Sequence, residues 1–151
     1  RGLGDVYKRQ AFFYAMLFYL LFNVVYSLLS FPTGIIADKV GKKKVLTAGY
    51  LLFACVAVGF ALVENLKTLP LLFALYGFSY ALTNGVQRAY VSDLTTAGKG
   101  VAYGVFHTAV GFSALAGGVI AGALMEFVSP QVPFMMASIL ALIAVGVLAI
   151  V

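Results

Sequence analysis

The sequence has few charged or chemically reactive side chains. Charged residues occupy 10% of its 151 positions, against about 25% in soluble globular domains. It contains five acidic residues, one histidine, one cysteine and no tryptophan. These numbers leave few groups for metal binding, a disulfide framework or acid–base catalysis. The composition therefore excludes a soluble enzyme, and we expect neither a metal site nor a cofactor.

Apolar residues dominate instead, at 63% of the chain, and the mean hydropathy is +1.04. One core of a chain this size could not bury so much apolar surface, so the excess must face lipid. Ten basic residues against five acidic ones would suggest nucleic acid in a soluble chain. Here the charges lie between apolar runs, as in loops that set membrane orientation. We expect the lipid bilayer as a partner and no nucleic acid.

Residues 1–10, RGLGDVYKRQ, differ abruptly from the apolar run that follows them. They carry three of the ten basic residues, and residues 5–10 resemble the in-frame translation of a transposon adapter used in sequencing libraries. We therefore set residues 1–10 apart as an adapter-like artefact without a structural role. The alternative is a genuine short lead-in. On the adapter interpretation, the chain is a fragment whose true start is missing.

A bilayer core about 30 Å thick needs about 20 apolar residues per helix. Five stretches meet this requirement: 11–37, 45–63, 69–94, 101–127 and 132–151. The connections between them are short, so neighbouring helices should be antiparallel. The sequence predicts an all-α polytopic membrane protein with five transmembrane helices.

Basic residues are distributed unevenly among the connections. Lys39 and Lys42–Lys44 mark the first connection as cytoplasmic under the positive-inside rule. Alternation then places Lys67 outside, and Arg88 and Lys99 inside. Six basic residues thus lie inside and one outside. We expect a multi-pass protein of the cytoplasmic membrane whose Lys42–Lys44 loop faces the cytoplasm.

The junction after the first predicted helix, residues 34–44, reads GIIADKVGKKK. It resembles the signature loop of the major facilitator superfamily of transporters, a Gly-x-x-Ala-Asp-basic-x-Gly-basic-basic pattern. The matching residues are Gly34, Ala37, Asp38, Lys39, Gly41, Lys42 and Lys43, and Ile36 stands where leucine is commoner. The alternative is a cytoplasmic loop whose charges only fix the topology.

The spacing of this motif has a physical rationale. Gly34 would let another helix approach closely, and Asp38 at a helix end could accept hydrogen bonds from the N-terminus of a neighbouring helix. Gly41 would permit a tight turn. The lysines would hold the loop at the anionic cytoplasmic surface.

The resemblance also implies which part of such a transporter the chain represents. The signature follows one helix and precedes four more, which fits helices two to six of a six-helix half. Residues 85–94, GVQRAYVSDL, and residues 100–104, GVAYG, look like the fourth-to-fifth helix junction of C-terminal halves. We therefore interpret residues 11–151 as helices 8 to 12, a partial half-bundle whose partner is the missing N-terminal half of the same polypeptide.

Arg88 is predicted at the cytoplasmic end of the third helix, where it could meet Asp38 or Asp93. An ion pair that forms when the cytoplasmic side closes and breaks when it opens would be a gate. We expect Asp38 to act in the transport cycle, with Arg88 as its partner. The alternative is an arginine that snorkels to the lipid headgroups.

Several polar side chains interrupt the apolar spans. Burying an unpaired polar group in hydrocarbon costs several kcal/mol, on the order of the transfer cost of an amide, so these groups should point into the bundle. The interior would be either a packed seam or a substrate cavity. The candidates for lining a cavity are Asn23, Tyr26, Tyr80, Asn84, Gln87, Tyr103 and His107. For His107, a neutral imidazole hydrogen-bonded to a neighbouring helix is the alternative.

Small residues recur every four positions on the fourth predicted helix, at Ala114, Gly118 and Gly122. Such a stripe lets helix backbones come close in lipid, so we expect it to line a helix contact. The contact could be a sliding surface for alternating access or simple tight packing.

The resemblance implies a secondary active transporter that moves a small solute by alternating access between two six-helix bundles. The alternative is a polytopic membrane subunit without transport activity, or a membrane-embedded enzyme. An enzyme would need reactive groups within the spans, and the sequence has no His-Glu-x-x-His or Gly-x-Ser-x-Gly motif and no acidic pair at depth. We therefore expect no enzymatic activity.

Overall fold

The computed structural model describes residues 2–95 and 98–150, which are helical except at short connections. The order is α1 (Gly2–Val40), α2 (Lys42–Leu62), the short 3-10 helix η1 (Leu66–Thr68), α3 (Leu69–Leu94), α4 (Lys99–Phe127) and α5 (Val132–Ile150). Within these ranges five helices are long and apolar enough to cross a membrane. The predicted fold class, an all-α protein with five membrane-spanning helices, is confirmed.

The helix boundaries agree with the prediction to within a few residues, except at the first helix. Helix α1 starts at Gly2 and ends at Val40, not at residues 11 and 37 as predicted. Between these ends only Pro32 is a residue that disfavours helical hydrogen bonding, and transmembrane helices tolerate such an interruption. The segment that was set apart, from Gly2 onwards, is therefore continuous with α1.

A single residue, Gly41, connects α1 to α2. Its φ of 107° lies in the region that glycine adopts readily and other residues avoid, so the sequence-based expectation of a tight turn at Gly41 is confirmed. Lys42, Lys43 and Lys44 were predicted in a loop, but they form the first turn of α2. The turn is this short because Gly41 alone reverses the chain.

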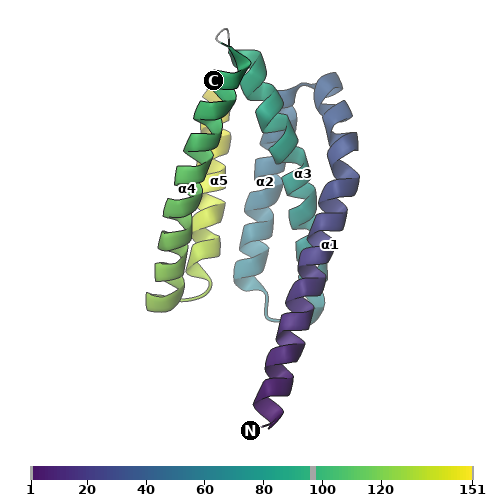
Figure 1. The fold of residues 1–151 in the computed structure, drawn as a ribbon, viewed down its shortest axis with the longest axis vertical. Helices are drawn as coiled ribbons and strands as arrows, with labels where there is room; N and C mark the ends of the chain where they lie inside the picture. The colour runs from purple at the N-terminus through teal and green to yellow at the C-terminus, as the bar shows by residue number, and fades with distance from the viewer. Residues whose placement is uncertain (1, 96–97, 151) are drawn as a thin grey trace.

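Helix α3 is central to the packing of the described residues. It contacts α1 and α2 along much of their length, and α2 in turn contacts α5 (Figure 1). Figure 1 shows α4 and α5 side by side, apart from α1. Helix α4 contacts α3 and α5 only slightly, and none of its residues is buried. The densest contacts therefore hold α1, α2 and α3 together.

Two glycines that sequence analysis did not single out allow these close contacts. A Cβ atom on Gly77 of α3 would lie 2.7 Å from the backbone oxygen of Phe22 in α1. A Cβ atom on Gly49 of α2 would lie 2.7 Å from Thr83 Cγ2 and 2.9 Å from Leu82 Cβ in α3. Both distances are too short for real carbon contacts, so only glycine fits at these helix crossings.

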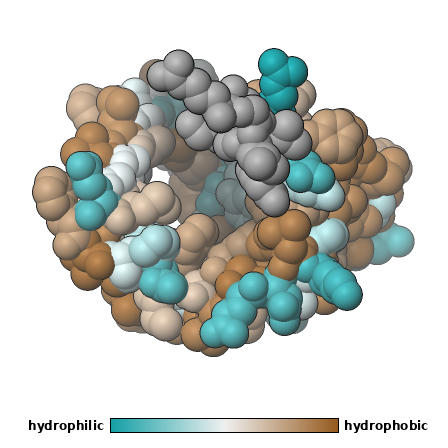
Figure 2. Space-filling model, turned by 90° about the horizontal axis from the view of Figure 1, so that it is seen from below, coloured by the Kyte–Doolittle hydropathy of each residue, from teal (hydrophilic) through white to brown (hydrophobic). Residues whose placement is uncertain are grey.

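The outer surface of the helices is apolar. Helix α4 exposes five large apolar side chains, each at least 66% accessible: Val101, Val105, Phe112, Leu115 and Val119. Figure 2, which looks at one end of the molecule, shows brown apolar side chains around much of the rim and a hollow between the helices. Such a surface would be unfavourable in water and is suited to lipid.

The connections alternate between the two ends of the bundle. The α1–α2 and α3–α4 connections lie at one end, which we call the Lys42 end, and the α2–α3 and α4–α5 connections lie at the other (Figure 1). This arrangement is the antiparallel succession that the short connections predicted.

Replacing Gly77 with alanine is expected to lower the free energy of unfolding of the full-length protein by about 1–3 kcal/mol, because the methyl group would push α1 from α3. The matched control is Gly85→Ala on the same helix, where an added Cβ meets no atom within 4 Å. Gly85→Ala should leave stability unchanged or raise it by about 0.5–1 kcal/mol. Unfolding in detergent measures both. Equal effects of the two substitutions would contradict the close α1–α3 approach.

Candidate functional site

The Lys42 end carries an ion pair between two helices. Lys42 Nζ at the start of α2 lies 2.6 Å from Asp93 Oδ2 near the end of α3. The Lys42 side chain is 22% exposed and that of Asp93 is 58% exposed. Water screens a pair in such a position, so it contributes about 0–1 kcal/mol. An interaction of this strength can form and break without threatening the fold.

Asp38 and Gly34 of the motif lie beside this ion pair. Together with Lys42 and Thr33 they line a small cavity of about 150 Å³ between α1 and α3. The Thr33 hydroxyl donates to the backbone oxygen of Ala81 in α3 at 3.0 Å and is nearly fully buried. Thr33, which sequence analysis missed, is therefore a polar link between α1 and α3.

Gly34 does not have the predicted role of allowing a close helix approach. A Cβ atom on Gly34 would meet no atom within 4 Å among the described residues, because the small cavity lies there. Gly77 and Gly49 make the close approaches instead. Lys39 is exposed in the last turn of α1, and Lys43 is half-exposed in the first turn of α2.

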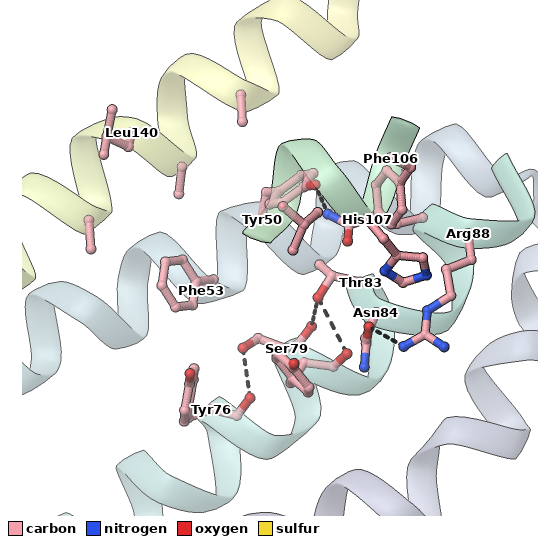
Figure 3. A pocket seen from close by; sticks show the side chains of 16 residues that line it. Tyr50, Phe53, Tyr76, Ser79, Thr83, Asn84, Arg88, Phe106, His107 and Leu140 are labelled. Atoms are coloured by element: carbon pink, nitrogen blue, oxygen red, sulfur yellow. Dashed lines mark hydrogen bonds between the residues drawn. The ribbon is translucent and has the colours of Figure 1, made fainter. Parts of the chain in front are cut away.

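Arg88 was predicted to pair with Asp38 or Asp93, and the structure contradicts this pairing. Arg88 Nη2 donates to Asn84 Oδ1 at 3.1 Å, on its own helix. Asp93 follows Arg88 by five residues, a rotation of about 140° around the helix, so the two side chains leave α3 on different sides. Asp93 consequently pairs with Lys42, while Arg88 lines a cavity between α2, α3, α4 and α5 (Figure 3).

A cavity of about 630 Å³ lies between α2, α3, α4 and α5. Its polar wall comes mainly from α3, and Arg88 stands at one corner of it (Figure 3). From α4, the His107 imidazole points toward the same corner (Figure 3). The opposite wall is apolar and contains Phe53, Leu140 and alanines of α5. The cavity therefore joins a basic corner to an apolar wall.

A second cavity, of about 440 Å³, lies between α1 and α3. The two cavities share Tyr76, Tyr80 and Asn84, so these residues form a common wall. Asn84 Nδ2 donates to the Tyr26 hydroxyl at 2.9 Å, and the Tyr26 and Tyr80 rings meet edge to face. The hydrogen bond and the ring contact fix this wall across α1 and α3.

The structure places most of the polar residues proposed for a cavity in these two walls. The larger cavity is lined by Tyr80, Asn84, Gln87 and His107. The smaller cavity is lined by Asn23 and Tyr26. Tyr103 lines neither of the two. The Asn23 amide donates to the backbone oxygen of Tyr19 on the same helix.

Sequence analysis missed Tyr76, which lies on the common wall. Tyr76, Tyr80, Asn84 and Arg88 are spaced four residues apart and so follow one side of α3. This spacing was a signal in the sequence that would have added Tyr76 to the set. Tyr50 was missed as well, and it carried no comparable signal. It belongs to α2 and its hydroxyl accepts a hydrogen bond from Gln87, a contact that only the fold brings about.

The stripe of Ala114, Gly118 and Gly122 was predicted to line a helix contact. Within the described chain these three residues are exposed, and Cβ atoms on both glycines would meet no atom within 4 Å. The expected contact is absent there because α4 lies at the side of the bundle and touches its neighbours only slightly.

No three His, Cys, Asp or Glu side chains in the described ranges come together as a metal site would require. The residues that could act on a ligand are instead hydrogen-bond donors, aromatic rings and one guanidinium group. Groups of this kind are suited to binding and orienting a molecule.

Comparison with known proteins gives the family. The family description Major Facilitator Superfamily matches residues 9–151. The chain belongs to the major facilitator superfamily. This is a family of transporters and not of enzymes, so the alternative of a membrane-embedded enzyme is excluded.

Two curated relatives are themselves described as uncharacterised transporters of this type. The relative from Methanocaldococcus jannaschii is 44% identical over 138 residues, which cover 91% of this chain and 34% of the relative. The relative YdeE from Escherichia coli is 31% identical over 127 residues, which cover 83% of this chain and 31% of the relative. The chain thus spans about a third of the length of the relatives it matches. No solved structure matches it significantly.

The residues that resemble the superfamily signature lie at the Lys42 end. The superfamily chain is a multi-pass membrane protein, and its signature residues 34–43 lie where α1, α2 and α3 converge. Ala37, Val45, Leu46 and Val86 form a buried apolar cluster at this point. The ion pair Lys42–Asp93 spans its polar edge.

A double-mutant cycle on Lys42→Gln and Asp93→Asn in the full-length protein is expected to give a coupling free energy of about 0.2–1 kcal/mol in unfolding experiments. The matched cycle on Arg88→Gln and Asp93→Asn should give no measurable coupling, because the two side chains lie on different sides of α3. Coupling in the second cycle and none in the first would contradict the Lys42–Asp93 pair and support the Arg88–Asp93 pair predicted from the sequence.

Proposed function

We propose that this superfamily member is a secondary active transporter that moves a small solute by alternating access. The single observation that carries the proposal is the polar wall of α3, which faces two cavities inside an otherwise apolar helix bundle. Polar and charged groups at such positions are costly in a membrane protein and mark ligand pathways. Transporters of this type bind their solute between helices near the bilayer midplane.

The Lys42 end supplies a candidate gate. In this proposal the ion pair between Lys42 and Asp93 forms when the cavity is closed at that end and breaks when it opens. Asp38 stands next to the pair and would exchange partners with it during opening. The low net strength of an exposed pair suits this role, because transport requires both states to be populated.

We further propose that residues 11–151 are helices 8 to 12 of the C-terminal half and that the Lys42 end faces the cytoplasm. The basic residues Lys39, Lys42, Lys43, Lys44, Arg88 and Lys99 support this orientation through the positive-inside rule. At the opposite end, Lys67 is the one basic residue outside the adapter-like residues 1–10, which carry Arg1, Lys8 and Arg9. The N-terminal half of the polypeptide would complete the cavity.

The access test places one cysteine on the common wall of the two cavities, Tyr80→Cys, in full-length protein whose other cysteines, including Cys55, are replaced. Alternating access predicts that an impermeant thiol reagent reacts with position 80 from either side of the membrane, at rates that depend on the gate. Asp93→Asn should raise the rate from the Lys42 side and lower the rate from the other side. Reaction from one side only, unchanged by Asp93→Asn, would favour a non-transporting subunit.

Orientation is tested with Lys43→Cys and Ser129→Cys in the same background. Ser129 lies in the α4–α5 connection, at the end opposite Lys43. In intact cells an impermeant reagent should label position 129, and it should label position 43 only after permeabilisation, because the basic residues hold that end inside. Labelling of position 43 in intact cells would reverse the topology.

A further inference from the structure

We infer that the solute bound in the larger cavity is a small organic anion with an apolar body. The inference deepens the proposed transport function and rests on it. It assigns the anionic group to the corner formed by Arg88 and His107, and the apolar body to the wall of Phe53 and Leu140 (Figure 3).

The first observation is the charge of the residues that line the larger cavity. Sixteen residues line the larger cavity, and Arg88 is the one with a permanent charge. No aspartate or glutamate is among the sixteen. Asp93, the acidic residue nearest to Arg88 in sequence, is engaged by Lys42 at the edge of the bundle. Among the described residues, the positive charge of Arg88 is therefore not balanced by an ion pair.

The hydrogen bonds of Asn84 hold Arg88 in place. Asn84 donates to the Tyr26 hydroxyl through Nδ2 and accepts from Arg88 through Oδ1. The guanidinium group has five N–H donors, and this contact uses one nitrogen, Nη2. The remaining donors suit a carboxylate, which an arginine binds through two parallel hydrogen bonds. An uncharged amide acceptor orients the guanidinium without neutralising it.

Two further features complete the assignment. His107 points toward the Arg88 corner from α4 and can donate a hydrogen bond from a ring nitrogen (Figure 3). Opposite the polar wall of α3 the lining is apolar, with Phe53 of α2 and Leu140 of α5. A volume of about 630 Å³ lies in the range of small-molecule sites, roughly 300–1,000 Å³. Arg88 would repel a cationic solute. A very polar solute would lose hydrogen bonds to water at the apolar wall and form none there.

The test measures the charge preference of the purified full-length protein with three matched sets of probes. Each set keeps one body and varies one group: benzoate, benzamide and benzylammonium; phenylacetate, phenylacetamide and phenethylammonium; hexanoate, hexanamide and hexylammonium. Titrations of thermal stabilisation give apparent dissociation constants. We expect the anion of at least one set to bind about tenfold or more tightly than its amide, as a charge-assisted hydrogen bond implies, and the cation to bind weakest.

Substitutions of Arg88 test whether the preference for anions arises at the corner formed by Arg88 and His107. Arg88→Gln should remove the anion preference, and Arg88→Lys, which keeps the charge but not the planar fork, should retain part of it. The matched control is Lys67→Gln, which removes a positive charge from η1 at the end away from Arg88 and should change nothing. If Arg88→Gln does not fold, the wild-type probe series still tests the anion preference, and Arg88→Lys still tests the role of Arg88 in it.

Equal binding of anions and amides, preference for cations, or stabilisation by none of the nine probes would overturn the assigned substrate class. An anion preference that survives Arg88→Gln would overturn its location. These results are independent of the access test at position 80. A protein that alternates but prefers amides would retain the transport function and lose the anion, whereas one that binds anions without alternating would lose the transport function.

Discussion

The structure depends on one constraint, that every backbone N–H and C=O group in a lipid environment must find a partner within the protein. Helices meet this condition along their whole length, and so the described chain is helical apart from a few connecting residues. The shortest connection is Gly41 alone, whose positive φ reverses the chain where other residues would be strained. Polar side chains within a span are also costly in lipid, so they are few and mark functional positions.

Helix α3 brings packing and polarity together. Its Gly77 and the facing Gly49 of α2 let three helix backbones come close, and Thr33 of α1 adds a buried hydrogen bond to it. The same helix presents Tyr76, Tyr80, Asn84 and Arg88 to the cavities. The close packing of α3 on α1 and α2 thus gives these polar residues a rigid support. If the wall binds a solute as proposed, such support would let it orient the solute with little rearrangement.

The pairing of charges at the Lys42 end illustrates why sequence proximity misled the prediction. Arg88 and Asp93 are close in the sequence and were predicted at similar depth, but helix geometry sends their side chains in different directions. Lys42, far from Asp93 in the sequence, is brought to it by the turn at Gly41 and the packing of α2 on α3. The glycines of the α4 stripe meet no neighbouring helix among the described residues, so the contact expected there stays a prediction. A stripe indicates that a helix can pack closely and does not say which partner is there.

The sequence by itself determined the fold class, the spans from α2 to α5 to within a few residues, the alternation of their ends and the turn at Gly41. Each of these follows from local properties, namely hydrophobic length, charge between spans and backbone freedom. Only the tertiary structure decided which face of each helix meets which neighbour. Lipid and protein interior accept the same apolar side chains, so the apolar pattern around each helix does not mark its buried side. The wall shared by Tyr26, Tyr80 and Asn84, and the contact of Gln87 with Tyr50, exist because of how α1, α2 and α3 cross.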